Sequence, residues 1–184
     1  MKNLKNIIAC CRLLFIYPGI LWSDDKFQMD LKRWKQIYHL ECSDFKALAF
    51  IMWEYPEFRN LFLYRNRFRY IYRIWIRVFY KPMNTLYLQA KEIGGGFFIQ
   101  HGFATMVTAE SVGCNCWVNQ QVTIGYRGTG RAPIIGDSVM ITCGAKVLGS
   151  ITVGAGAVIG ANAVVIKDVE AGAVMTGIPA KRIR

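Results

Sequence analysis

The C-terminal half of the chain places an aliphatic side chain at every sixth position, a spacing that neither an α-helix nor an ordinary strand produces. The pattern is clearest over residues 153–164, VGAGAVIGANAV, where one six-residue unit occurs twice in succession. Two series run without a miss: Ile135, Ile141, Val147, Val153, Ile159 and Val165, and Val139, Ala145, Ile151, Ala157, Ala163 and Val169. Three hexads joined by sharp corners form one triangular coil, whose strands pair in parallel with those of the next coil. The repeat therefore predicts a parallel β-helix with the first series stacked along its axis.

Upstream, the step of six breaks in a segment that contains His101. The aliphatic series continues there in shifted frames, through Ile93, Ile99, Met106, Val112, Val118 and Ile124. Ile99 and Met106 are seven residues apart, and one extra residue in a strand predicts a bulge, which turns side chains out of the regular lattice. Neutral imidazole accepts a hydroxyl proton near neutral pH, so His101 is a candidate general base.

A second break separates Ile124 from Ile135, which are eleven residues apart instead of six. The five extra residues predict a loop at residues 126–133, YRGTGRAP, which is rich in glycine and carries Arg127 and Arg131. Two interpretations stay open for this loop, a tolerated surface insertion and a flap that covers a substrate site.

The run IGDSVMITCGAKVLGSITVGAGAVIGANAVVIKDV, with the tail TGIPAKRI, resembles the hexapeptide-repeat acyltransferases. Within them, the chain is most similar to the serine acetyltransferases and to the enzymes that O-acetylate surface polysaccharides. The resemblance covers residues 86–184 and implies a left-handed parallel β-helix there, after an N-terminal helical region at residues 1–85. It also implies acetyl-CoA as co-substrate, no metal, a homotrimer or a dimer of trimers, and a flap role for the loop.

By the same resemblance, His101 corresponds to the histidine that removes the hydroxyl proton before the oxygen attacks the thioester directly. The residues that would contact the acceptor are Gln100, Asn119, Gln120, Arg127 and Arg131. Those that would line coenzyme A are Gly125, Tyr126, Thr142, Cys143, Gly144, Gly160, Ala161, Lys167, Pro179 and Lys181, with Lys146 and Arg182 as further partners for its phosphates. The site would lie between neighbouring prisms of the trimer.

Three positions depart from the pattern of the serine enzymes. Those enzymes usually carry an aspartate directly before the catalytic histidine, where this chain has Gln100, and a second one about one coil earlier, where it has Leu86. They also carry a second histidine in the flap, at the position of Ala132. Because an aspartate pair suits the ammonium group of serine, its loss favours a neutral acceptor. We therefore expect a sugar hydroxyl of surface-polysaccharide biosynthesis, small or lipid-linked, with serine O-acetylation for cysteine biosynthesis as the alternative.

The retained motifs fit the polysaccharide branch, namely His101-Gly102, QVTIG over residues 121–125, and Tyr126-Arg127. The group that orients His101 stays open among Glu92, Glu110, Gln120 and a backbone carbonyl. A metal hydratase on the same fold is disfavoured because its site needs three histidine ligands, and the repeat domain contains His101 as its single histidine. A catalytically silent scaffold is disfavoured by His101 itself and by the intact motifs for coenzyme A.

The first half of the chain is nearly free of glycine, and its pattern predicts helices near 24–39, 43–53 and 57–80. Asp24 and Ser43 are candidate N-caps, Pro56 separates the last two helices and Pro82 ends the third. Within the segment 59–81, Arg69, Arg73 and Arg77 would share one helical face. Three interpretations stay open for this basic aromatic segment: packing on the prism with solvated arginines, contact with a membrane surface, and, least favoured, nucleic-acid binding, for which no module is recognised.

A net charge of +11 favours anionic partners. The apolar stretch 7–22 is too short and too interrupted, by Arg12 and Pro18, to span a membrane, and it lacks a signal-peptide cleavage site. An interfacial helix is compatible with it, so peripheral contact with the inner membrane face is a further expectation. The six cysteines show neither metal spacing nor a disulfide framework, and we expect small reduced core residues in a cytoplasmic protein.

Overall fold

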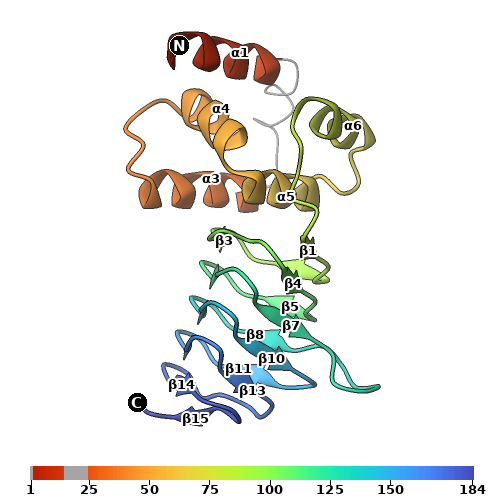
Figure 1. Ribbon diagram of the computed structural model, residues 1–184, viewed down its shortest axis with the longest axis vertical. Helices are drawn as coiled ribbons and strands as arrows, with labels where there is room; N and C mark the ends of the chain where they lie inside the picture. The colour runs from red at the N-terminus through yellow and green to blue at the C-terminus, as the bar shows by residue number, and fades with distance from the viewer. Residues whose placement is uncertain (1, 15–24) are drawn as a thin grey trace. The chain divides into compact units, whose positions relative to one another are not determined.

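The computed structural model describes residues 2–14 and 25–184, and the chain divides into two compact units, Met1–Met83 and Asn84–Arg184. The described part of the first unit is helical (Figure 1). Its elements are α1 (Lys2–Leu14), α3 (Asp25–Ile37), α4 (Asp44–Glu54), α5 (Pro56–Arg65) and α6 (Tyr70–Phe79). None of the described residues forms a helix that is long and apolar enough to cross a membrane.

Aromatic side chains from α3 and α5 form the core of the helical unit. The rings of Phe27 and Phe62 meet edge to face at 5.5 Å, and Trp34 lies 4.9 Å from Phe58. Beside them Asp30 is completely buried, and its two carboxylate oxygens accept hydrogen bonds of 2.8 and 3.1 Å from Arg65. A buried carboxylate is tolerated only when a charged partner satisfies it, so this pair ties α3 to α5.

The helix predicted over residues 57–80 is in fact two helices, α5 and α6, separated by residues 66–69. The side-chain amide of Asn66 donates to the carbonyl of Phe62 at 2.9 Å, and such side-chain bonds to the backbone compete with helix continuation. Arg69 is consequently the N-cap of α6, and the predicted face keeps only Arg73 and Arg77 within the helix. Ser43 does occupy the N-cap position of α4, without a side-chain capping bond, whereas Asp24 lies outside the described residues.

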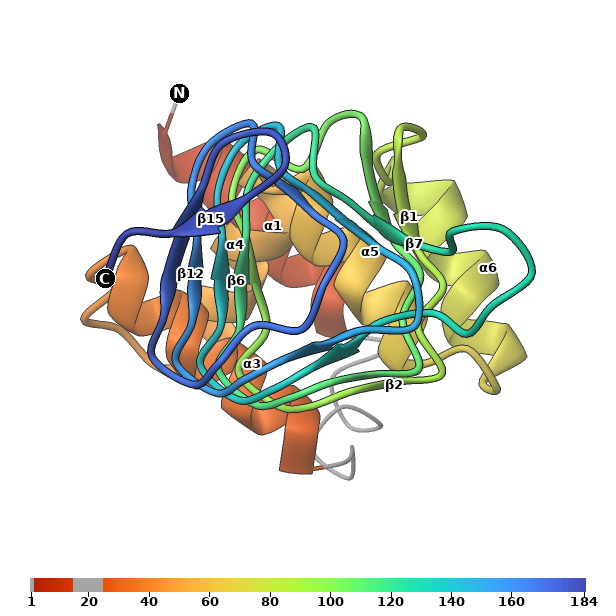
Figure 2. The ribbon, with the colours of Figure 1, turned by 90° about the horizontal axis from the view of Figure 1, so that it is seen from below.

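The second unit is a β-solenoid built from three sheets, which form the walls of a triangular prism seen end-on in Figure 2. Sheet A contains β1 (Leu86–Leu88), β4 (Thr105–Val107), β7 (Thr123–Gly125), β10 (Lys146–Leu148) and β13 (Val164–Val165). Sheet B contains β2 (Glu92–Ile93), β5 (Ser111–Val112), β8 (Ile134–Ile135) and β11 (Thr152–Val153). Sheet C contains β3 (Phe98–Ile99), β6 (Trp117–Val118), β9 (Met140–Ile141), β12 (Val158–Ile159), β14 (Val174–Thr176) and β15 (Lys181–Arg182), and only its last pair is antiparallel.

The aliphatic column along the axis confirms the predicted period of six. Five members of the first series are at most 2% exposed, namely Ile135, Ile141, Val147, Val153 and Ile159. They pair in register between neighbouring coils, Val153 with Ile135 and Ile159 with Ile141. Fully burying side chains of this size stabilises the fold by roughly 1.5–3 kcal/mol each. The hexad repeat thus supplies the core of the solenoid.

Two assignments within the series are wrong. Met106 is 40% exposed, and Val107 occupies the axis instead, in register with Ile124. The first break is therefore a step of eight from Ile99 to Val107, and the pleat sends the preceding Met106 to the outer face. Val169 bridges Val153 and so belongs to the axial column, not to the second series.

Candidate active site

His101 lies where the chain turns from sheet C to sheet A, directly after β3. This turn and the equivalent turns after β6, β9 and β12 stack on one another and define an edge that we call corner CA. The segment after β14 hydrogen-bonds to Val164 of the preceding coil before the chain reverses into β15. His101 has a left-handed backbone, with φ of 63°, and the N–H of Phe103 donates to its carbonyl at 2.5 Å across Gly102. The tight turn leaves His101 exposed, so the break in the repeat does bring the imidazole out of the lattice.

The turn is held by neutral groups. Asn119, on the next coil of corner CA, donates from its side-chain amide to Gln100 Oε1 at 2.9 Å. The buried Thr105 hydroxyl bonds the carbonyls of Phe103 and Asn119, at 3.3 and 3.2 Å. Among the residues that the structure describes, no hydrogen-bond partner is found for the imidazole of His101 itself.

The topology narrows the choice of a group that could orient His101. Glu92 lies in β2 and Glu110 directly precedes β5, so both belong to sheet B and its approach, away from corner CA. Glu110 is also engaged by Lys91, whose hydrogen bond lowers the pKa of the carboxyl. Gln120 lies on corner CA one coil from His101, and its Oε1 is buried with no hydrogen-bond partner among the described residues. Of the three side chains, only Gln120 lies on the corner that carries His101.

Most residues predicted to line coenzyme A fall on the same corner. Thr142, Cys143 and Gly144 follow β9, and Gly160 and Ala161 follow β12. Backbone hydrogen bonds join the successive turns, from Gln121 to Phe103, from Gly144 to Gln120 and from Asn162 to Cys143, at 2.9–3.0 Å. Residues 142–144 and 160–161 therefore continue the column that begins at His101, and Pro179 follows β14.

Small residues are required along this column. Gly144 has φ of 72°, and a Cβ added there would lie 2.0 Å from Asn162 Oδ1. At Gly160 an added Cβ would lie 2.7 Å from Thr176 Cγ2. The turns consequently present backbone instead of side chains, which is the surface along which an extended amide-containing chain can bind.

Most of the remaining predicted residues lie at a different edge, whereas Lys181 is in β15 of sheet C. Gly125 is the last residue of β7, and Tyr126, Arg127 and Arg131 belong to the loop between β7 and β8. This loop projects outward from the turn between sheets A and B, which we call corner AB (Figure 2). Lys167 also lies at corner AB, after β13. Within one chain, the structure therefore does not bring the loop together with His101.

Ser150 fixes the loop and was missed by sequence reasoning. Its hydroxyl accepts from the backbone N–H of Arg131 at 2.6 Å and donates to the carbonyl of the same residue at 3.2 Å. An added Cβ at Gly130 would lie 2.7 Å from this hydroxyl oxygen, so the glycine allows the close approach. A lone serine opposite an insertion gives no recognisable sequence signal, because the contact is set by the stacking of coils.

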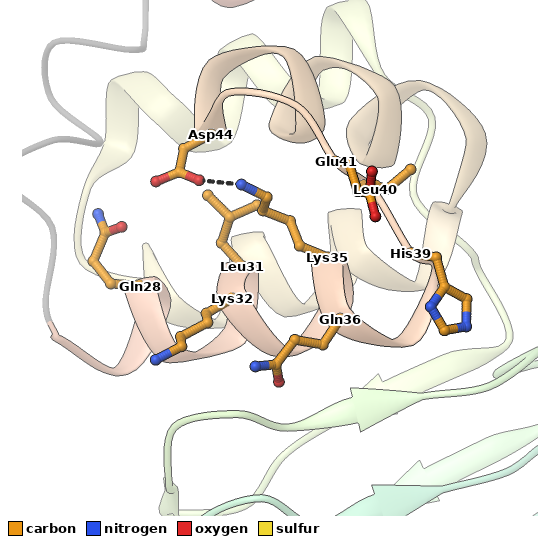
Figure 3. A pocket seen from close by; sticks show the side chains of 9 residues that line it. All are labelled: Gln28, Leu31, Lys32, Lys35, Gln36, His39, Leu40, Glu41 and Asp44. Carbon is orange, nitrogen blue, oxygen red and sulfur yellow. Dashed lines mark hydrogen bonds and ion pairs between the residues drawn. The ribbon is translucent and has the colours of Figure 1, made fainter.

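The helical unit contains an open cavity of about 590 Å³ between α3 and the start of α4 (Figure 3). Lys35 and Asp44 face each other across it in an ion pair of 2.5 Å. Its lining consists of Gln28, Leu31, Lys32, Lys35, Gln36, His39, Leu40, Glu41 and Asp44. None of the predicted site residues is among them.

All six cysteines are free thiols, as expected, but the prediction of core positions is wrong for most of them. Cys116 is buried, and burial raises the pKa of its thiol to about 11. Cys11 and Cys42 are exposed, and the other three are partly exposed. Among the described residues, no group of histidine, cysteine or acidic side chains is arranged to hold a metal ion.

Comparison with known proteins gives a consistent set of relatives, although no family model matches the sequence. A serine acetyltransferase of Bacillus pumilus is 50% identical over 99 residues, which cover 50% of this chain and 44% of that protein. A serine acetyltransferase structure from Neisseria gonorrhoeae superposes with a TM-score of 0.65 at 27% identity, covering 94% of this chain and 70% of that one. A serine acetyltransferase in complex with CoA gives 0.56 at 27% identity, covering 86% and 68%.

The match to the curated relative thus spans less than half of that protein's length, while the structural match extends over most of the present chain. The sequence likeness and the β-solenoid agree on the same group of relatives. Both depend on the hexad repeat, which forms the solenoid and also carries the resemblance. By its sequence relatives and by its fold, this chain is homologous to the serine acetyltransferases and has the β-solenoid of the hexapeptide-repeat acyltransferases.

Proposed function

We propose that this chain is an acetyl-CoA-dependent O-acetyltransferase in which His101 is the general base. The observation that carries the proposal is the exposed imidazole on a left-handed turn, at the head of a column of small residues on corner CA. His101 takes the proton of the acceptor hydroxyl, and the hydroxyl oxygen forms the new ester bond to the acetyl carbon. The carbon–sulfur bond breaks, and the coenzyme leaves as the thiol after accepting a proton.

The residues of corner CA fit the coenzyme. Acetyl-CoA supplies the activated acetyl group when bound, and the backbone of residues 142–144 and 160–161 offers peptide groups to its amide-containing arm. Glycine is required at Gly144 and Gly160 by the stacking of coils, because a side chain at either would collide with the next coil. Lys181, in β15, lies at the end of this column and would meet the phosphates.

Serine is the acceptor that the relatives favour. The sugar acceptor expected from the sequence finds no support among them, because the compared proteins are named serine acetyltransferases. One observation keeps a neutral acceptor as a second candidate. Where an aspartate was expected beside the catalytic histidine, Gln100 is hydrogen-bonded to Asn119, so this wall of the site offers amide groups and no negative charge to a substrate ammonium.

A trimer would complete the site. His101 lies on corner CA and the flap loop on corner AB, so one site can use both only if two copies supply them. We propose a threefold packing of prisms in which corner CA of one copy lies beside corner AB of the next. We propose that the trimer acts in the cytoplasm, where acetyl-CoA is available.

The test is release of thiol from acetyl-CoA by the purified chain, with serine or a panel of sugars and nucleotide-sugars as acceptor. Turnover with serine that His101→Ala abolishes supports the serine enzyme, and turnover restricted to sugars supports the neutral acceptor. Gln100→Asp, which restores the expected charge without changing the fold, should raise kcat/KM for serine and lower it for a neutral acceptor. Activity that survives in His101→Ala would refute the general-base role.

A further inference from the structure

Helix α6 exposes an apolar stripe that the proposed function does not use. Ile71, Ile74 and Val78 follow one another at i, i+3 and i+7, so they share one side of the helix. They are 76%, 46% and 68% exposed. Tyr70, the first residue of the helix, is 73% exposed, and Phe68, which precedes the helix, is 88% exposed. We call these five residues the α6 stripe. Monomeric soluble proteins rarely leave so continuous an apolar surface in water.

Arginines border the α6 stripe. Arg73 and Arg77 lie along one side of the helix, and Arg67 and Arg69 precede it. Two of the guanidinium groups lie over aromatic rings, Arg67 at 5.1 Å from Phe68 and Arg69 at 5.6 Å from the ring of Tyr72. Residues 58–91 contain no acidic residue, so nothing in this part of the sequence offsets the positive charge.

We propose that the α6 stripe and its arginines bind the surface of a membrane that contains anionic lipids. An amphipathic helix of this kind lies in the plane of the interface, with its apolar side chains at the boundary of the acyl chains. Arginines beside the stripe reach up to the phosphates and extend their apolar stems along it. This inference goes beyond the proposed acetyl transfer and does not depend on it.

The positive charge of this segment favours an anionic membrane over a second copy of the chain as the partner. An isologous contact would oppose the arginines of one α6 to those of the other, with no carboxylate between them. Nucleic acid would satisfy the arginines but would leave Ile71, Ile74 and Val78 in water. An anionic lipid surface would accommodate both the apolar side chains and the arginines of α6. Insertion across the membrane is excluded, because α6 has a length of 10 residues.

The experiment is co-sedimentation of the full chain with vesicles. Vesicles with about 30% phosphatidylserine should bind the protein, vesicles of phosphatidylcholine alone should not, and about 0.5 M salt should release most of it. Ile74→Asp should lower the bound fraction by at least ~5-fold, because a carboxylate enters the stripe. Met29→Asp is the matched control, since it makes the same change at an exposed apolar residue of α3 and should bind as the wild type does.

A second pair of variants tests the charge. Arg77→Gln should weaken binding, and Lys32→Gln, which removes one exposed cation from α3, should weaken it less. Circular dichroism and thermal unfolding confirm that each variant is folded. Equal binding to neutral vesicles, or equal binding by Ile74→Asp and Met29→Asp, overturns the proposal. A smaller assembly of Ile74→Asp in lipid-free light scattering, without a change in vesicle binding, assigns the stripe to contact between copies instead.

Discussion

The division of the predicted site between corner CA and corner AB leads to a quantitative prediction about mixed oligomers. His101→Ala removes the general base and leaves the loop intact, whereas Arg127→Ala/Arg131→Ala disables the loop and leaves His101 intact. We expect each variant to be inactive alone. If the chain forms the proposed trimer, co-expression of the two variants with different affinity tags and purification on both tags in turn leaves only trimers that contain at least one copy of each.

The expected activity follows from counting sites around the ring. Each site takes corner CA from one copy and corner AB from the next, so it works only where a loop-variant copy is followed by a histidine-variant copy. Either composition of mixed trimer contains one such neighbour pair, which restores about one third of the wild-type activity per trimer. If each site were built within a single chain, the mixture would have no activity, because every chain carries one of the two sets of substitutions.

The assay is thiol release from acetyl-CoA with the acceptor that the wild type uses. A mixture of His101→Ala with the triple variant His101→Ala/Arg127→Ala/Arg131→Ala is the control, and it should stay inactive because no intact His101 is present. An inactive mixture of the first pair would refute the shared site. Full activity of the loop variant alone would show that the loop arginines are not part of the site.

Three further predictions concern the fold. Ile141→Ala should lower the free energy of unfolding by about 2–5 kcal/mol in urea titration, because it leaves a cavity in the axial column. Asp30→Ala should cost about 3–5 kcal/mol by leaving Arg65 buried without its acid, and a loss below ~1 kcal/mol would contradict the burial of this pair. Alkylation at about pH 8 should modify the exposed Cys11 and spare Cys116 until the protein unfolds, because burial keeps the Cys116 thiol protonated; mass spectrometry of the native protein reads this directly.

In the helical unit, the sequence could predict the helices, because their formation depends on nearby residues. Helical segments near α3, α4 and α5 follow from periodicity and from Pro56, since both act within a few residues. The break at Asn66 was missed, because whether a side-chain amide caps a helix or points to solvent depends on the packing around it. The Asp30–Arg65 pair was missed for the same reason, as its partners are 35 residues apart.

The candidate site likewise combines features that the sequence predicts with features that depend on the packing. The break in the repeat identified the segment of His101, but the register, with Val107 on the axis and Met106 outside, depends on which of two neighbouring side chains fits the interior. The choice among candidate orienting groups also needed the structure. Glu92, Glu110 and Gln120 look equivalent as polar residues in the sequence, and only their positions on the coil separate them.

By itself, the sequence determined the solenoid, because a hexad repeat of aliphatic residues buries its column in no other way. It also determined that His101 and the loop interrupt that repeat. Only the tertiary structure decided which corner each interruption occupies, because the corner depends on which residues of the preceding coils face the axis and which form the turns. That arrangement aligns Gln100, Asn119, Gly144 and Gly160 behind His101, and it places the loop on another edge, where one chain alone does not complete the proposed site.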